Sequence, residues 1–236
     1  MVKAYIINRH ELEHFEYDEA IFSEGRKAKI EKITHDDDKQ LSACVELLLI
    51  HALKELDDGI ELPLKITEEE SGNLLLETPV KGYEKIYFNM SHSRDYAACV
   101  VSDNPVGIDI ETIKTKEVEH MDKILHPDEM LLLSFVSNPS EKKKYFYECW
   151  VSKESYLKNL GCGLSVRPNE FLVEEEKLVT ELPNLEQRYV HVCKSKEIKN
   201  ADFKFDGEYR LAICSLKKEK MEIELVQREA DGASAK

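Results

Sequence analysis

The order of the predicted elements is the feature that most limits what this chain can fold into. An opening strand is expected over residues 2–7, and a long amphipathic helix over residues 39–55, where apolar residues recur at three- and four-residue spacing. Short strands separated by turn residues then cover residues 62–112. The same order returns with helices over residues 118–160 and strands between residues 170 and 226. A helix followed by strands, twice over, predicts two α+β halves.

A loose internal echo supports this duplication. Tyr96-Ala-Ala-Cys-Val-Val-Ser102 resembles Tyr209-Arg-Leu-Ala-Ile-Cys-Ser215, and each segment follows a long amphipathic helix, although two ordinary apolar strands would also match by chance. We therefore predict a pseudo-twofold pair of similar α+β halves, each a long helix packed on a small, mainly antiparallel sheet. The predicted division is residues 1–105, residues 106–227 and a flexible tail over residues 228–236.

Charge and cysteine usage limit the class of protein. The chain carries 33 Lys and Arg against 47 Asp and Glu, a formal net charge of -14, which argues against a protein that grips nucleic-acid phosphates. Six cysteines are scattered singly and are expected to be buried thiols of a reducing compartment. No segment contains the roughly 18–20 consecutive apolar residues that a membrane helix needs. The apolar run at the start of the sequence is too short for a signal peptide. A cytoplasmic protein without membrane contact is expected.

Gly107-Ile-Asp-Ile-Glu111 is the most informative short segment. Side chains alternate along a strand, so Asp109 and Glu111 face one way while the two isoleucines face the core. Neighbouring carboxylates repel unless a cation lies between them, and Mg²⁺ prefers such oxygen ligands together with water and phosphate. On this segment alone, an edge strand with a solvated acidic face remains the commoner alternative.

Asn89-Met-Ser-His-Ser93 lies between two predicted strands and is expected to be a turn at a sheet end. Its backbone N–H groups, hydroxyls and imidazole would suit the oxygens of a phosphate. A serine and a histidine together also allow nucleophilic catalysis, which would require a carboxylate to orient His92 and an oxyanion hole. The commonest role of such a turn is merely structural.

The helix expected from about residue 140 carries a third group of polar side chains. Trp150, Glu154 and Lys158 fall at successive four-residue steps, with Lys153 adjacent, so one face carries an indole, a carboxylate and amines. A surface pair of Glu154 and Lys158 beside a core tryptophan would explain the same pattern. Gly161 and Gly163 end the helix as a C-terminal cap would.

The order and spacing of these three blocks resemble the Sfp-type 4'-phosphopantetheinyl transferases. That family shows N-x-S-H-S, then G-I-D-I-E, then W-x-x-K-E-S-x-x-K followed by G-x-G-L, which this chain matches over residues 89–93, 107–111 and 150–164. The resemblance covers roughly residues 1–216. It implies a monomer of two halves with coenzyme A and Mg²⁺ in the cleft between them.

The resemblance also implies roles for individual residues. The metal would be held by three carboxylates, those of Asp109, Glu111 and Glu154. The phosphates of coenzyme A would be met by basic and polar side chains: Lys153, Lys158, Ser91 and His92. The 3'-phosphate would face His92, Arg26 and Lys29, and Glu129 matches a further acidic position.

The implied reaction transfers the phosphopantetheine arm of coenzyme A to a serine of an apo carrier protein and releases 3',5'-ADP. The catalytic residues would be Asp109 on the metal, Glu154 as a base for the serine proton and Lys158 as an acid or charge partner for the leaving phosphate. Fatty-acid, polyketide, nonribosomal-peptide and siderophore carriers all remain open. A catalytically silent homologue and an unrelated Mg²⁺ phosphohydrolase using Asp109 and Glu111 are the alternatives.

Two departures from the family pattern concern the adenine side. The G-x-P segment common before the serine-histidine motif is replaced by Ser71-Gly72-Asn73-Leu74, and an arginine position near the start of the second helix is Leu41. We therefore expect the adenine to be bound differently here.

Overall fold

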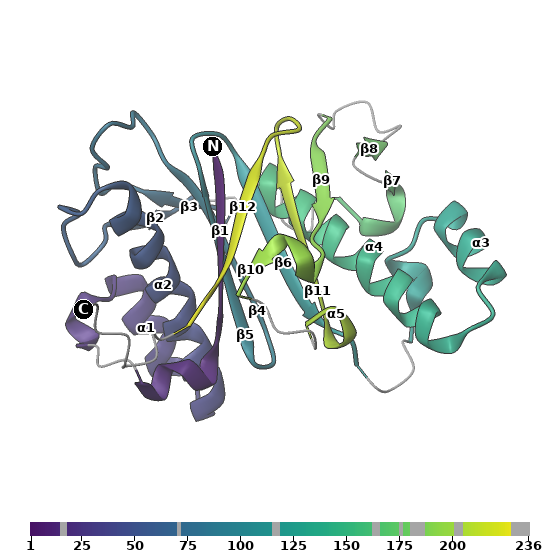
Figure 1. The fold of residues 1–236 in the computed structure, drawn as a ribbon, viewed down its shortest axis with the longest axis horizontal. Helices are drawn as coiled ribbons and strands as arrows, with labels where there is room; N and C mark the ends of the chain where they lie inside the picture. The colour runs from purple at the N-terminus through teal and green to yellow at the C-terminus, as the bar shows by residue number, and fades with distance from the viewer. Residues whose placement is uncertain are drawn as a thin grey trace, which may run out of the picture.

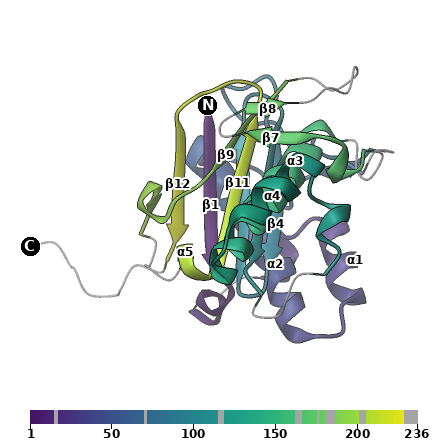
Figure 2. The ribbon, with the colours of Figure 1, turned by 90° about the vertical axis from the view of Figure 1, so that its right-hand side faces the viewer.

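The computed structural model describes residues 1–14, 18–69, 72–114, 119–161, 166–174, 177–179, 187–200 and 205–227. These residues form four layers, with helices on the two outer sides and two sheets between them (Figure 1, Figure 2). The predicted α+β class is confirmed.

The first sheet has five strands in the order β10, β12, β1, β5 and β4. Their bounds are Ile198–Lys199, Met221–Val226, Val2–Asn8, Tyr96–Ser102 and Tyr87–Ser93. The pairs β1–β5 and β4–β5 are antiparallel, whereas β1–β12 and β10–β12 are parallel. The expectation of a mainly antiparallel sheet therefore holds for only part of this sheet, because β12 arrives from the second sheet and runs beside β1 in the same direction.

The second sheet has three strands, all antiparallel, in the order β6 (Val106–Thr112), β11 (Tyr209–Ser215) and β9 (Tyr189–Val192). Two small hairpins lie outside both sheets. They are formed by β2 (Ile66–Glu68) with β3 (Leu74–Leu76) and by β7 (Leu172–Glu174) with β8 (Lys177–Val179).

Two long helices form the outer layers, α2 (Asp36–Leu56) and α4 (Pro139–Leu160). Helix α4 begins where Asn138 accepts hydrogen bonds from the N–H groups of Ser140 and Glu141, and it ends at Gly161 with φ of 64°. The shorter helices are α1 (Glu24–Lys32), α3 (Pro127–Phe135) and α5 (Phe205–Glu208). None of the described helices is both long enough and apolar enough to span a bilayer.

Strand alternation divides the apolar residues among three core layers. On β5, Cys99 and Val101 pack toward α2, whereas Val100 packs between the two sheets. Ile108 and Ile110 of β6 join this inter-sheet core and are fully buried, as the sequence predicts. The other face of the second sheet packs against α4.

The five cysteines within the described residues are buried and free, as expected. They are Cys44, Cys99, Cys149, Cys193 and Cys214. Cys162 and Gly163 lie outside the described residues, as does the predicted tail over residues 228–236.

One local prediction is wrong. Residues 89–93 are not a turn at a sheet end but the second part of strand β4, which continues to Ser93. Their polar side chains are compatible with a strand because they find partners on β6. Strands β5 and β6 lie within the region of residues 62–112 for which short strands are predicted.

Gly107 is required by the close approach of α4 to β6. A Cβ atom at this position would lie 2.0 Å from the carbonyl oxygen of Ser155 and 2.6 Å from the backbone nitrogen of Asn159. Both are backbone atoms of the helix, so no side-chain rotation relieves the clash. Glycine at this position therefore sets how closely α4 lies over β6.

We predict that Gly107→Ala lowers the free energy of unfolding by about 3 kcal/mol, the upper end of the usual cost of overpacking. Gly25→Ala is the matched control, because a Cβ atom there meets nothing within 4 Å and alanine favours the helix. Urea unfolding of the two variants checks this. Equal stabilities would show that the approach of α4 to β6 tolerates a side chain.

Candidate active site

The edges of the two sheets meet at β4 and β6, and side chains of β4 join them. Asn89, Ser91 and Ser93 lie two residues apart on β4, so they share one face of the strand. Each accepts a hydrogen bond from a backbone N–H of β6, at 3.3, 3.4 and 3.0 Å; the donors are Ile108, Ile110 and Thr112 in the same order. We call this arrangement the β4–β6 ladder.

Asp109 lies on β6 beside the ladder and is almost completely buried, with 4% of its surface exposed. Its Oδ1 accepts hydrogen bonds from Ser91 at 2.8 Å and from the Lys158 ammonium at 2.6 Å. Its Oδ2 is buried and has no hydrogen-bond partner among the residues that the structure describes. A buried carboxylate oxygen without a partner is costly, so this atom is a candidate ligand for a cation.

Glu111 is the second carboxylate of β6 and lies two residues further along the same face. Its Oε2 accepts from Ser93 at 3.0 Å, and its Oε1 accepts from the indole nitrogen of Trp150 at 3.4 Å. The tryptophan of α4 and the serine of β4 therefore hold this side chain from two different layers.

Helix α4 brings Glu154 and Lys158 to the same place. Four-residue spacing puts them on one face, one turn apart. A cavity of about 350 Å³ is lined by both residues and by the two carboxylates of β6. The remaining lining residues are Met90, Ser91, His92 and Trp150. The structure thus brings together three predicted metal ligands and the predicted catalytic lysine.

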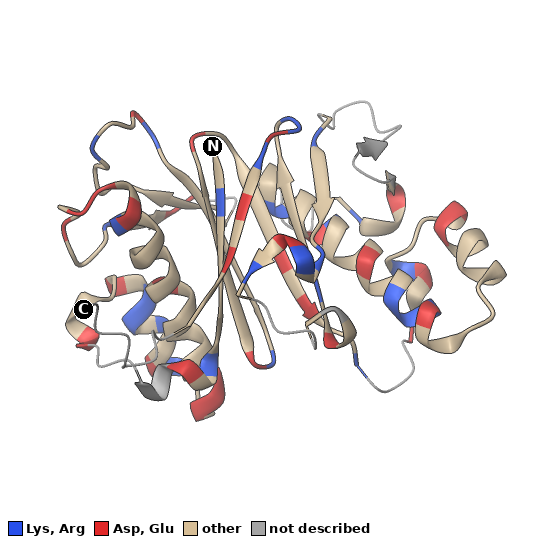
Figure 3. Cartoon of the chain, viewed as in Figure 1, with Lys and Arg blue, Asp and Glu red and all other residues tan. Residues whose placement is uncertain are grey.

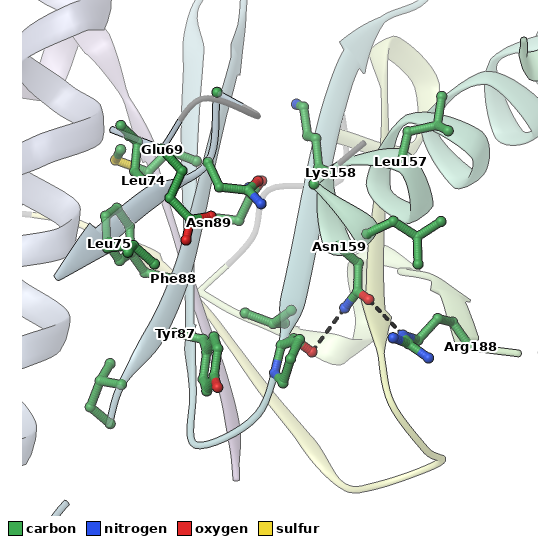
Figure 4. Close-up of a pocket in the computed structure, with 18 of the residues that line it drawn as sticks. Glu69, Leu74, Leu75, Tyr87, Phe88, Asn89, Leu157, Lys158, Asn159 and Arg188 are labelled. Carbon is green, nitrogen blue, oxygen red and sulfur yellow. Dashed lines mark hydrogen bonds between the residues drawn. The ribbon is translucent and has the colours of Figure 1, made fainter. Parts of the chain in front are cut away.

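A second cavity of about 620 Å³ adjoins the first and shares Met90, Glu154 and Lys158 with it. Figure 4 shows its two walls, with Asn89 on β4 facing Lys158 and Asn159 on α4. Asn159 donates to the Pro105 carbonyl at 2.8 Å and accepts from Arg188 at 2.8 Å. Both cavities are therefore lined by residues of β4 and α4.

Burial raises the pKa of all three carboxylates above their ordinary values. For Asp109, burial outweighs the opposing effect of Lys158. For Glu111 and Glu154, the negative charge of Asp109 raises the pKa further. A divalent cation in this cavity would relieve these unfavourable charges, and oxygen donors suit Mg²⁺.

The three carboxylates offer the oxygen atoms that a divalent cation prefers, but they are not yet close enough together to coordinate one ion. Among the described residues, no three His, Cys, Asp or Glu side chains already stand together as a metal site. Mg²⁺ usually takes only one or two protein carboxylates and completes its shell with water and substrate phosphate. The unpartnered Oδ2 of Asp109 is the atom that fits this role best.

His92 and Arg26 lie at the same end of the first half. His92 is exposed, yet partial loss of hydration and the charges of Lys158 and Arg26 lower its pKa. Arg26 is fixed by Glu46 at 3.2 Å and by Ser42 at 3.2 Å. The guanidinium of Arg26 is the positive charge on this side of the site, and it is partly balanced by its ion pair with Glu46.

Lys29 lies one turn further along α1 from Arg26 and is exposed. In Figure 3 the basic residues of α1 are drawn in blue on the outer helical layer. The structure therefore puts Arg26 near the predicted site, whereas Lys29 stands on the open surface of the same helix.

Lys153 and Glu129 do not reach the cavity and are corrected to structural roles. Lys153 is fully buried and pairs with Glu129 at 2.8 Å. Its ammonium also donates to the carbonyls of Pro168 at 2.7 Å and Phe171 at 2.6 Å. Consecutive helix residues point about 100° apart, so Lys153 and Glu154 face different surroundings. Nothing in this geometry supports the expected contact between Lys153 and a phosphate.

Ser93 is a site residue that sequence reasoning missed. The motif over residues 89–93 predicts a turn and gives Ser93 no role of its own. The signal was present in the alternation of Asn89, Ser91 and Ser93, which matches the alternation of Asp109 and Glu111. The match becomes informative only when the structure shows that β4 and β6 lie side by side, so that Ser93 contacts Glu111.

Three carboxylates and a lysine around one cavity lined by β4, β6 and α4 are the arrangement expected of a protein that binds a phosphorylated ligand through a divalent cation. Comparison with known proteins specifies the class. The sequence profile of the 4'-phosphopantetheinyl transferase superfamily matches residues 105–214, which include β6, α4 and β11 up to residue 214.

Curated relatives agree with this match. The chain is 30% identical over 197 residues to 4'-phosphopantetheinyl transferase psf-1 of Bacillus pumilus, covering 81% of this chain and 78% of that protein. It is 24% identical over 199 residues to 4'-phosphopantetheinyl transferase Sfp of Bacillus subtilis strain 168, covering 83% of each. The match to 4'-phosphopantetheinyl transferase gsp of Aneurinibacillus migulanus is 30% identical, but it covers 56% of this chain and 52% of that protein.

The chain belongs to the 4'-phosphopantetheinyl transferase superfamily. Phosphopantetheinyl transfer is the function that this family and these relatives support.

We predict that Glu154→Gln stabilises the protein at high pH when EDTA is present. Because the pKa of Glu154 is raised by folding, its ionisation opposes folding. This cost is absent below the ordinary value of 4.5 and grows as the pH rises through the folded-state pKa. The variant should exceed the unaltered protein by about 0.5–1 kcal/mol near pH 8, a typical gain from relieving an unfavourable charge.

Urea unfolding at about pH 4 and pH 8 measures the difference. Glu141→Gln is the control, because Glu141 lies on the same helix but pairs with Lys144 at 2.8 Å. It should give no gain at pH 8. A Glu154→Gln effect that is the same at both pH values would contradict the assignment of an unfavourable charge to this site.

Proposed function

We propose that this chain transfers the 4'-phosphopantetheine arm of coenzyme A to a serine of an apo acyl or peptidyl carrier protein, releasing 3',5'-ADP. The observation that carries the proposal is the shared cavity of Asp109, Glu111, Glu154 and Lys158, in which one buried oxygen of Asp109 has no partner within the described part of the chain. Three carboxylates would repel a diphosphate unless a cation bridged them.

Asp109, Glu111 and Glu154 would hold Mg²⁺ in this proposal. A bound Mg²⁺ would neutralise charge on the diphosphate oxygens, usually a main part of catalysis in phosphoryl transfer. Ser91 and Ser93 hold two of these carboxylates through hydrogen bonds of 2.8 and 3.0 Å.

Glu154 is the proposed base for the carrier serine. Its raised pKa keeps it a stronger proton acceptor than an ordinary glutamate, and it lines both cavities, where ligand and carrier would meet. Lys158 would contact the leaving phosphate. Its side chain is 28% exposed and can therefore reach a ligand in the cavity, and its ammonium lies 2.6 Å from Asp109, the proposed metal ligand beside which the phosphate would bind.

The phosphates of coenzyme A would extend from Lys158 toward the basic end of the first half. We propose that Ser91 and His92 border the diphosphate and that Arg26 and Lys29 attract the 3'-phosphate. Loss of hydration lowers the pKa of His92 first, and the nearby charges of Lys158 and Arg26 lower it further, so both cations lie close to this side chain. The larger cavity would take another part of the coenzyme.

We also propose that the two halves are related by a pseudo-twofold axis. In the first half, strand β1, helix α2 and the strands β4 and β5 give the sheet order β1-β5-β4; in the second, β6, α4, β9 and β11 give β6-β11-β9. The first tyrosines of β5 and β11 touch, with the ring centroids of Tyr96 and Tyr209 4.7 Å apart. The division at residue 105 stays a prediction, since β10 and β12 join the first sheet.

A monomer acting in the cytoplasm is the form we propose. Two alternatives remain distinguishable by assay. A silent homologue would bind the coenzyme or the carrier without transfer, and a phosphohydrolase would release phosphate from simple esters without an acceptor protein.

We predict that the protein, given apo carrier protein, coenzyme A and Mg²⁺, adds one phosphopantetheine to the carrier as measured by intact mass. EDTA should abolish the transfer and excess Mg²⁺ should restore it. Asp109→Asn should lower the rate by about 100-fold or more, because even the loss of an outer contact to a metal ligand costs about 10- to 100-fold. Asp58→Asn, a change of an exposed aspartate on the surface, is the control and should keep the rate. No transfer to any of several carriers would rule the proposal out.

Lys29→Ala should raise the KM for coenzyme A by about 2- to 5-fold, the effect of one exposed charge contact. The KM for 3'-dephospho-coenzyme A should not change, since that substrate lacks the phosphate that Lys29 attracts. Lys32→Ala removes the same charge from the last turn of α1 and should alter neither value. If Lys29→Ala raises both KM values equally, Lys29 does not bind the 3'-phosphate.

A further inference from the structure

The β4–β6 ladder has a second property besides joining two strands. Two of its three rungs also hold a carboxylate of the predicted metal site, and the serines come from the opposite half of the chain. Ser91 donates to Asp109 at 2.8 Å, and Ser93 donates to Glu111 at 3.0 Å. The third rung, Asn89, lies beside Gly107 and Ile108, where β6 offers no carboxylate.

From this geometry we infer that Ser93 is a positioning residue, which fixes the carboxylate of Glu111 for a divalent cation across the junction of the two halves. The inference rests on the proposed function, because it gives Glu111 the role of a metal ligand. Ser93 itself touches no substrate in this account; it acts through Glu111.

The hydrogen-bonding capacity of Ser93 is completely used at this position. A hydroxyl has one proton to donate and two lone pairs that accept. An ionised Glu111 can only accept, so the Ser93 proton points to its Oε2 at 3.0 Å. The two lone pairs then accept from the Thr112 N–H and the Thr112 hydroxyl, both at 3.0 Å. Ser93 therefore has one orientation available, and that orientation aims at Glu111.

Ser91 repeats the same arrangement one rung earlier. It donates to Asp109 and accepts from the Ile110 N–H at 3.4 Å and from Lys158 at 3.1 Å. Two serines two residues apart thus make equivalent contacts to two carboxylates two residues apart. Asn89 accepts from a backbone N–H of β6 without contacting a carboxylate. Pairing with the strand amides therefore does not by itself require the carboxylate contacts that the two serines make.

Glu111 needs such support more than an exposed glutamate would. Its other hydrogen bond within the described residues, from the indole of Trp150, is long at 3.4 Å. Without Ser93 the carboxylate would be free to turn away from the cavity, and a cation would have to order it again on binding. Loss of an outer contact of this kind typically weakens metal affinity by about 10-fold or more.

Mn²⁺ binding to the full chain, followed by electron paramagnetic resonance without coenzyme A or carrier, tests the inference. We expect Ser93→Ala to weaken Mn²⁺ binding by about 10-fold. Asn89→Ala is the matched control, because it removes a rung that holds no carboxylate. Both variants should lower the melting temperature to a similar extent, about 2–4 °C, but Asn89→Ala should leave Mn²⁺ binding within about 2-fold of the unaltered protein.

If Ser93→Ala binds Mn²⁺ as the unaltered protein does, or if both variants lose affinity equally, Ser93 only joins the strands and the inference is overturned. Ser93→Cys, a weak donor of similar size, replaces the alanine variant should that one not fold, and it should also bind Mn²⁺ more weakly. Failure of the proposed function gives a different result, because the unaltered protein would then neither bind Mn²⁺ nor transfer phosphopantetheine. That result would also overturn the inference, which rests on the proposed function. Normal transfer with unchanged Mn²⁺ binding in the serine variant rejects the inference alone.

Discussion

The backbone N–H groups along one edge of β6 need partners, and the side chains of β4 supply them. When the edges of two sheets meet without main-chain hydrogen bonds between them, the backbone N–H groups of the edge strands normally bind water or stay unpaired. Here an asparagine and two serines take the place of a neighbouring strand. These side chains hold the two sheets together at the point where the carboxylates lie, so the junction of the sheets is also part of the candidate site.

The close approach of α4 completes this arrangement from the other side. Because Gly107 has no side chain, the helix lies near enough to β6 for Lys158 to reach Asp109 and for Trp150 to reach Glu111. The resulting cavity collects three carboxylates whose burial opposes their ionisation. Crowded buried carboxylates of this kind lower the stability of the protein, and strained charge of this sort is common at functional sites.

Regular alternation made much of the site readable from sequence. A two-residue period put Asp109 and Glu111 on one face of β6, and a four-residue step put Glu154 beside Lys158 on α4. Contacts between distant segments were not readable in the same way. The polar residues 89–93 suggested a turn, because their partners lie 19 residues away on a strand of another sheet. Lys153 and Lys158 looked equivalent until the packing of α3 and Pro168 showed which of them is buried.

The central claim is that Asp109, Glu111 and Glu154 share one divalent ion between the two halves. Anomalous diffraction from a crystal grown with Mn²⁺ and coenzyme A tests it most directly. The account predicts a single manganese peak within the cavity, about 2.1 Å from an oxygen of Asp109 and from at least one of the other two carboxylates. A manganese peak bound elsewhere, or a coenzyme whose diphosphate lies away from Asp109, would contradict it.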